Sequence, residues 1–146
     1  MPSTDFGLSR WDQLFSLGPT LEVQIGYDST YRLDADRAPY IPADRQPALV
    51  DTGSALSCID SVLATRLNLP AVGHQSVAGV GGVYRANMYL AQICIPDLAW
   101  VIHGQFAGVH LAAGGQPHRA LLGQHFLRRF RLFYDGPSGS VTLSSD

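Results

Sequence analysis

The chain has 146 residues, which is enough for one buried core but too few for two ordinary domains. Ten lysine and arginine residues against twelve aspartate and glutamate residues give a net charge of −2, without the basic stripe that nucleic-acid phosphates require. Nucleic acid is therefore not expected as a partner. A hydrophobic share of 46%, with nine prolines and fifteen glycines, is typical of a loop-rich β protein.

The sequence also bears on the compartment. The first fifteen residues have neither a basic start nor a continuous apolar stretch, so a secretory signal is not predicted and a cytoplasmic location is expected. The longest apolar segment near the middle is interrupted by Pro96, Asp97 and His103, well short of the roughly 20 residues that span a bilayer. No membrane association is predicted. Cys58 and Cys94 are expected to be buried free thiols.

The N-terminal part divides into an arm and the start of a domain. Residues 1–20 are expected to form an arm, in which the apolar positions 11, 14, 15 and 17 allow one short helical turn. Residues 21–146 are expected to form the domain. Its first strand is predicted at residues 21–25, where apolar and polar side chains alternate up to a glycine.

The next segments surround Asp51. The polar, proline-containing stretch from Asp28 to Pro47 is expected to be a long excursion, with a hairpin around Tyr31 to Leu33. Ala48 to Val50 form an apolar strand that leads directly into Asp51, and residues 56–59 resume the strand.

The rest of the chain alternates strands and turns. Asp60 is placed to cap a short helix over residues 61–67, and residues 75–96 predict a hairpin around the glycine-rich turn at 79–82. The remaining expected elements are strands at 98–111 and 120–123, one or two helical turns at 124–129, and a final hairpin with arms at 130–134 and 140–143.

Three short segments stand out for their residue types and their order. Residues 48–54 are Ala-Leu-Val-Asp-Thr-Gly-Ser, residues 79–82 are Gly-Val-Gly-Gly, and residues 120–123 are Ala-Leu-Leu-Gly. In this order they resemble the active-site loop, the flap and the apolar-apolar-glycine element of the retropepsin-like aspartic peptidase family. The final hairpin resembles the single-domain bacterial type of that family.

The resemblance implies a fold and an activity. The fold would be all-β, a closed acid-peptidase (retropepsin-like) barrel with a flap hairpin and one or two short helices, and the activity would be that of an endopeptidase on extended peptides or proteins. Such hydrolysis needs one carboxylate to deprotonate water and one carboxylic acid to protonate the carbonyl oxygen. Asp51 is the only aspartate followed by Thr or Ser and then Gly, so the second carboxylate is expected from a second copy in a two-fold homodimer.

The family's site residues carry over to matching positions. Thr52 would join the two loops at the two-fold axis, Gly53 would let the substrate backbone approach, and Ser54 would hydrogen-bond the carboxylate. The expected substrate-binding residues at the flap are Gly79, Val80, Gly81, Gly82 and Val83. No cofactor or metal is expected, because the five histidines lack the spacing of metal ligands.

Two positions depart from many viral members, and other interpretations stay open. Ala55 and Gln124 replace an acidic residue and an arginine that form an ion pair near the viral dimer interface, so the hairpin at 130–143 is the candidate for another interface. A non-catalytic peptide-binding or assembly module on the same fold is the alternative function. Self-processing, with the arm before about residue 20 removed, is a variant of the enzyme interpretation.

Overall fold

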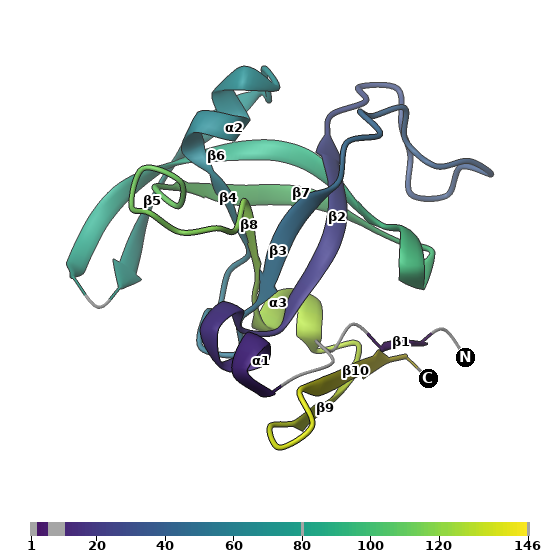
Figure 1. The fold of residues 1–146 in the computed structure, drawn as a ribbon. Coiled ribbons are helices and arrows are strands. Elements are labelled where there is room, and N and C mark those ends of the chain that lie inside the picture. The colour runs from purple at the N-terminus through teal and green to yellow at the C-terminus, as the bar shows by residue number, and fades with distance from the viewer. Residues whose placement is uncertain (1–2, 6–10, 80, 146) are drawn as a thin grey trace.

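The computed structural model describes residues 3–5, 11–79 and 81–145, and these are mostly β-sheet (Figure 1). The larger sheet has seven strands in the order β2 (Thr20–Gly26), β3 (Gln46–Val50), β8 (Ala120–Leu122), β4 (Cys58–Asp60), β7 (Trp100–Val109), β6 (Gly82–Ile95) and β5 (Ala71–Gly79). The smaller sheet has three strands in the order β1 (Ser3–Asp5), β10 (Ser140–Ser144) and β9 (Arg131–Asp135).

Helices are short. The described residues contain α1 (Trp11–Leu17), α2 (Ser61–Arg66), α3 (Gln124–Leu127) and a single 3-10 turn, η1 (Pro96–Leu98). The mostly β character with few short helices confirms the expected class, although three α-helices form where one or two were expected. No helix among the described residues is both long and apolar enough to cross a membrane.

The core follows from the alternation of side chains along the strands. Leu21, Val23 and Ile25 on β2 are buried, and they pack with apolar side chains from β6 and β8 in the main cluster. Strand β2 pairs with β3 at one end and with β6 at the other, so it contacts two strands that lie far apart in the order of the sheet. This double pairing curls the sheet around the core.

Local signals explain most element boundaries. The Asp60 carboxylate accepts a hydrogen bond from the Leu63 backbone N–H at 3.1 Å, which confirms the predicted cap of α2. The helix ends before Asn68, whose φ is +55°. Two of the three predicted hairpins, β5–β6 and β9–β10, are present. Cys58 and Cys94 are buried free cysteines, as expected.

The segment between β2 and β3 corrects one prediction. No hairpin forms around Tyr31 to Leu33; residues 27–45 run as turns and irregular backbone, with Tyr31 buried. The Asp28 carboxylate organises this loop, because it accepts hydrogen bonds from the Tyr40 N–H and the Arg37 guanidinium at 2.9 and 2.8 Å. Side-chain contacts therefore replace the strand pairing that was expected.

Candidate active site

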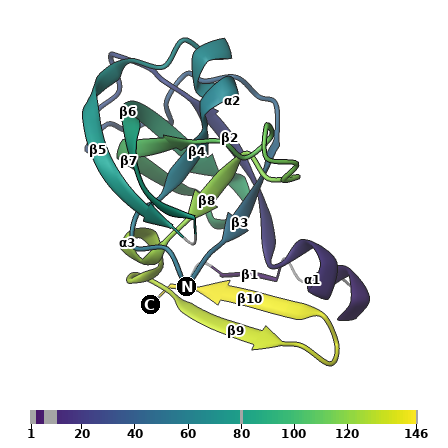
Figure 2. The same ribbon diagram turned by 90° about the vertical axis from the view of Figure 1, so that its left-hand side faces the viewer.

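Asp51 lies on the loop that connects β3 to β4, and β8 lies between these two strands (Figure 2). Strand β8 pairs in parallel with β3 and antiparallel with β4. The Asp51 backbone N–H donates to the Leu122 carbonyl at 2.9 Å, so the last residue of β8 fixes the start of the loop. The strand that carries Asp51 and the strand that returns from it are therefore held by one later segment.

Gly123, which follows β8, packs directly beneath the loop. Its N–H donates to the Ser57 hydroxyl at 3.1 Å. A Cβ atom on Gly123 would lie 2.5 Å from the carbonyl oxygens of both Ser54 and Leu56, which is closer than real Cβ atoms approach backbone. Only glycine allows this contact, so the glycine of the Ala-Leu-Leu-Gly segment has a steric reason in this fold.

Gln124 adds two further contacts from the start of α3. Its backbone N–H donates to the Ser54 carbonyl, and its side-chain Nε2 donates to the Thr52 carbonyl, each at 2.8 Å. The His125 N–H donates to the Ala55 carbonyl at 3.2 Å. Gln124, one of the two positions that depart from many viral members, therefore binds the loop backbone with a neutral amide. Such a group needs no acidic partner.

The Asp51 carboxylate itself is half-buried and lightly bonded. Among the described residues it accepts one hydrogen bond, from the Gly53 N–H to Oδ1 at 3.0 Å. Thr52 and Gly53 beside it are exposed. A carboxylate can accept about four hydrogen bonds, so Asp51 keeps most of its capacity for a water molecule or a second carboxyl group.

The structure corrects the expectation for Ser54. Its hydroxyl donates to the Leu56 carbonyl at 2.6 Å, not to the Asp51 carboxylate. The single hydroxyl proton is thus used to close the loop. Ser54 belongs to the same loop as Asp51, Thr52 and Gly53, but in this structure it stabilises the backbone.

Cys58, on the return strand, was not predicted as a neighbour of the site. Burial raises the pKa of its thiol to about 11, and the negative charge of Asp51 adds to the shift. Burial, followed by the charge of Cys58, also raises the pKa of Tyr84 on β6. The only sequence signal for Cys58 was its position after Asp51 on the return strand.

The β5–β6 hairpin carries the other predicted site residues. Gly79 pairs with Gly82, whose φ of +114° suits glycine, and Val83 is exposed. Val80 lies outside the described residues. Among those described, no hydrogen bond joins the tip to the Asp51 loop. The base of the hairpin does reach the site, because Ala86 and Met88 pack in one buried cluster with Cys58.

Metal ligands do not gather in the described part of the chain. No group of three or more His, Cys, Asp or Glu side chains there is arranged to hold a metal ion. The chemistry available at Asp51 is that of a partly solvated carboxylate on a fixed loop.

Comparisons with known proteins give little further information. No protein-family model matches the sequence, and no curated protein matches it. The chain is similar to a protease of simian foamy virus (mac), solved in solution, with a TM-score of 0.46 and 11% identity over 75% of this chain and 91% of that one. A likeness this distant carries no functional conclusion.

Proposed function

We propose that the protein is a retropepsin-like aspartic endopeptidase, of the single-domain bacterial type, that acts as a homodimer on extended peptides. The observation behind the proposal is the state of Asp51. Its loop is held from behind by Leu122, Gly123 and Gln124, while its carboxylate accepts a single hydrogen bond from the described residues. A fixed backbone with a free carboxylate is what positioned acid–base catalysis requires.

In the proposed mechanism, two Asp51 carboxyl groups from two copies share one proton. The ionised carboxylate removes a proton from a water molecule placed between them, and that water attacks the peptide carbonyl carbon. The protonated carboxyl group donates its proton to the carbonyl oxygen. The exposed Thr52 and Gly53 lie beside the carboxylate, which leaves the front of the loop open for the second copy and the substrate.

Other features support three parts of the proposal: the closed barrel, the flap and the dimer interface. The pairing of β2 with both β3 and β6 favours a closed barrel. The exposed glycines at 79, 81 and 82 favour a flap that closes over substrate, with Val80 and Val83 toward the subsites. Strand β9 is an outer strand of the smaller sheet, and its Phe133 and Tyr134 are 65% and 52% exposed, which favours it as a dimer interface.

The N-terminal arm and the cytoplasmic location stay predictions. Within the arm, β1 pairs with β10 and Leu14 is buried. Removal of residues 1–20 by self-processing would therefore expose an edge of the smaller sheet and part of the core.

The test is cleavage of a peptide library across acid and neutral pH. We expect Asp51→Asn to lower kcat/KM about 10²- to 10⁴-fold, which is the usual contribution of acid–base groups, without a change in melting temperature. Asp97→Asn, at an exposed aspartate before β7, is the matched control and should retain activity. Equal mixing of wild type and Asp51→Asn should leave roughly a quarter of dimers active.

Two outcomes would contradict the proposal. Activity that only halves on mixing would show that one subunit holds a complete site. A dimer that binds library peptides without cleaving them would favour the non-catalytic peptide-binding or assembly module.

A further inference from the structure

A groove runs between strand β7 and helix α3. Two adjoining cavities of about 290 and 240 Å³ form it, and both are lined by Ile102, His103 and His125. At one end Leu56 and Ser57 contribute, so the groove reaches the part of the Asp51 loop that precedes β4. The groove belongs to neither the front of that loop nor the tip of the β5–β6 hairpin.

The backbone of β7 forms one wall of the groove and is unpaired there. Strand β7 pairs with β6 from Trp100 to Ala107, but with β4 only from Ala107 to Val109. The Ala107 N–H donates to the Ser57 carbonyl on the β4 side at 3.3 Å.

The direction of the free backbone groups follows from this bond. Backbone groups alternate in direction along a strand, so those of Gln105, His103 and Val101 point the same way as Ala107, away from β6. Among the described residues none of the three finds a backbone partner on that side. A row of unpaired N–H and C=O groups is a template for one more strand.

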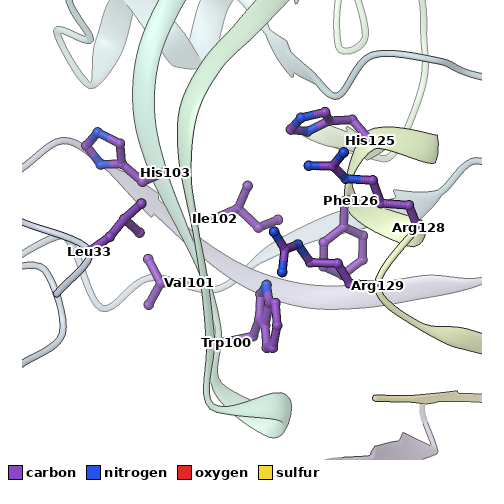
Figure 3. A pocket seen from close by; sticks show the side chains of 9 residues that line it. All are labelled: Leu33, Trp100, Val101, Ile102, His103, His125, Phe126, Arg128 and Arg129. Atoms are coloured by element: carbon purple, nitrogen blue, oxygen red, sulfur yellow. The ribbon is translucent and has the colours of Figure 1, made fainter. Parts of the chain in front are cut away.

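The opposite wall is positively charged. Figure 3 shows the guanidinium groups of Arg128 and Arg129 extending from the α3 side toward β7, with the His125 ring above them. The side chains of Trp100 and Phe126 form an apolar floor, and no described Asp or Glu lines either cavity. Neither arginine forms an ion pair with a described carboxylate. This concentration of positive charge contrasts with the net charge of −2 of the chain.

We propose that this groove binds an extended, acidic peptide segment of a partner or substrate protein, which adds as a strand to the free edge of β7. Its backbone would pair with Val101, His103 and Gln105, and its acidic side chains would contact Arg128 and Arg129. A neighbouring apolar side chain would fit against the floor. The site is separate from Asp51, so the proposal does not depend on catalysis.

The chemical class of the ligand is inferred from both walls of the groove, the free strand edge and the two arginines. A small anion would contact the arginines but leave the strand edge unpaired. A nucleic-acid backbone would need a longer basic stripe than two arginines provide. An acidic peptide uses the edge, the charge and the apolar floor together, and it can supply about one backbone hydrogen bond per residue to the edge.

Binding is measured with the full-length Asp51→Asn protein, so that a probe is not cleaved. The probe is a short fluorescent peptide of alternating threonine and valine that ends in phenylalanine and two glutamates, and the control peptide has glutamines in place of the glutamates. We expect the acidic peptide to bind more tightly. Arg128→Gln with Arg129→Gln should weaken its binding roughly five- to tenfold. Arg66→Gln, at an exposed arginine on α2, should not.

Amide hydrogen exchange then tests strand addition. On binding, amide exchange at Val101, His103 and Gln105 should slow, while exchange at Ile102, whose backbone N–H points toward β6, should not change. Equal binding of both peptides would overturn the proposal. So would an effect of the arginines without protection of the edge, which indicates an anion site only. Protection confined to the β5–β6 hairpin would place the peptide beside that hairpin and would also overturn the proposal.

Discussion

Asp28 and Asp51 each follow a core strand almost directly, yet their carboxylates have opposite surroundings. Asp28 accepts hydrogen bonds from the Thr30 N–H and hydroxyl, the Arg37 guanidinium and the Tyr40 N–H. In the part of the chain that the structure describes, Asp51 accepts one, from the Gly53 N–H. In the first loop the carboxylate holds the backbone, whereas in the second the backbone is held by other groups.

The difference separates a structural carboxylate from one that is available for chemistry. Asp60 belongs with Asp28, because it is 1% exposed and accepts from the N–H groups of Leu63, Leu111 and Ala112. A carboxylate that already accepts three or four hydrogen bonds keeps little capacity for water or substrate. Asp51 is half-buried and unsaturated on a loop that does not need its carboxylate, which is the arrangement of a functional group.

The largest loss of stability is expected from substitution of Asp60. Asp60→Ala leaves two buried N–H groups and one partly buried N–H group without an acceptor, so we expect a loss of about 3 kcal/mol of unfolding free energy and a melting temperature lower by about 10 °C. Asp51→Ala should cost less than about 1 kcal/mol, because one half-exposed hydrogen bond is lost. Thermal unfolding of both variants measures the two losses of stability. Equal losses would show that Asp51 is as structural as Asp60.

A smaller effect is expected where other groups fix the Asp51 loop. Gly123→Ala forces a Cβ atom against the carbonyl oxygens of Ser54 and Leu56, so it should cost about 1 to 3 kcal/mol and lower kcat/KM beyond the loss of folded protein. Gly136→Ala is the matched control, because its Cβ would lie 3.7 Å from Tyr134. Unchanged stability and activity in Gly123→Ala would mean that this packing does not position Asp51.

The sequence was informative where the signal is local. The cap at Asp60, the alternation in β2 and the turn after Asp51 each depend on neighbouring residues, and each is present. The contacts of Asp28 with Arg37 and Tyr40 span an irregular loop without periodicity, so no sequence pattern predicted them. Such contacts are decided by tertiary packing.

The details of the candidate site were less predictable. The partner of the Ser54 hydroxyl depends on where the Leu56 carbonyl lies, and that position depends on the placement of β8 between β3 and β4. The groove beside Arg128 depends on the shortness of β4, which leaves part of β7 unpaired. Neither relation is visible in residue spacing.

The stabilising role of the Asp28 carboxylate can be tested by measuring the melting temperature at different pH values. The Tyr40 N–H, Arg37 and Thr30 hold the pKa of Asp28 well below its usual range. Because the pKa is lowered on folding, this carboxylate stabilises the protein above its unfolded pKa of about 4, and the contribution is lost as the pH falls below that value. The melting temperature of Asp28→Asn should therefore lie below that of wild type at neutral pH, and the gap should narrow in acid. Asp44→Asn, exposed in the same loop, should follow wild type at every pH. A constant gap would exclude the carboxylate as the cause.

The smallest expected effect is the change in the pKa of Cys58 when the charge of Asp51 is removed. Burial is the larger cause of the raised pKa of Cys58, about 11, and the charge of Asp51 is the second cause. Asp51→Asn removes that charge, so the pKa of Cys58 should fall while staying above its ordinary value of about 8.5. The measurement is the rate of alkylation of Cys58 by iodoacetamide against pH, in a Cys94→Ser background so that one thiol reacts. Asp97→Asn, which removes a charge elsewhere on the surface, should leave the profile unchanged. A profile that stays the same in Asp51→Asn would mean that the carboxylate is directed away from Cys58, and the available lone pairs of Asp51 would then face a different side of the loop.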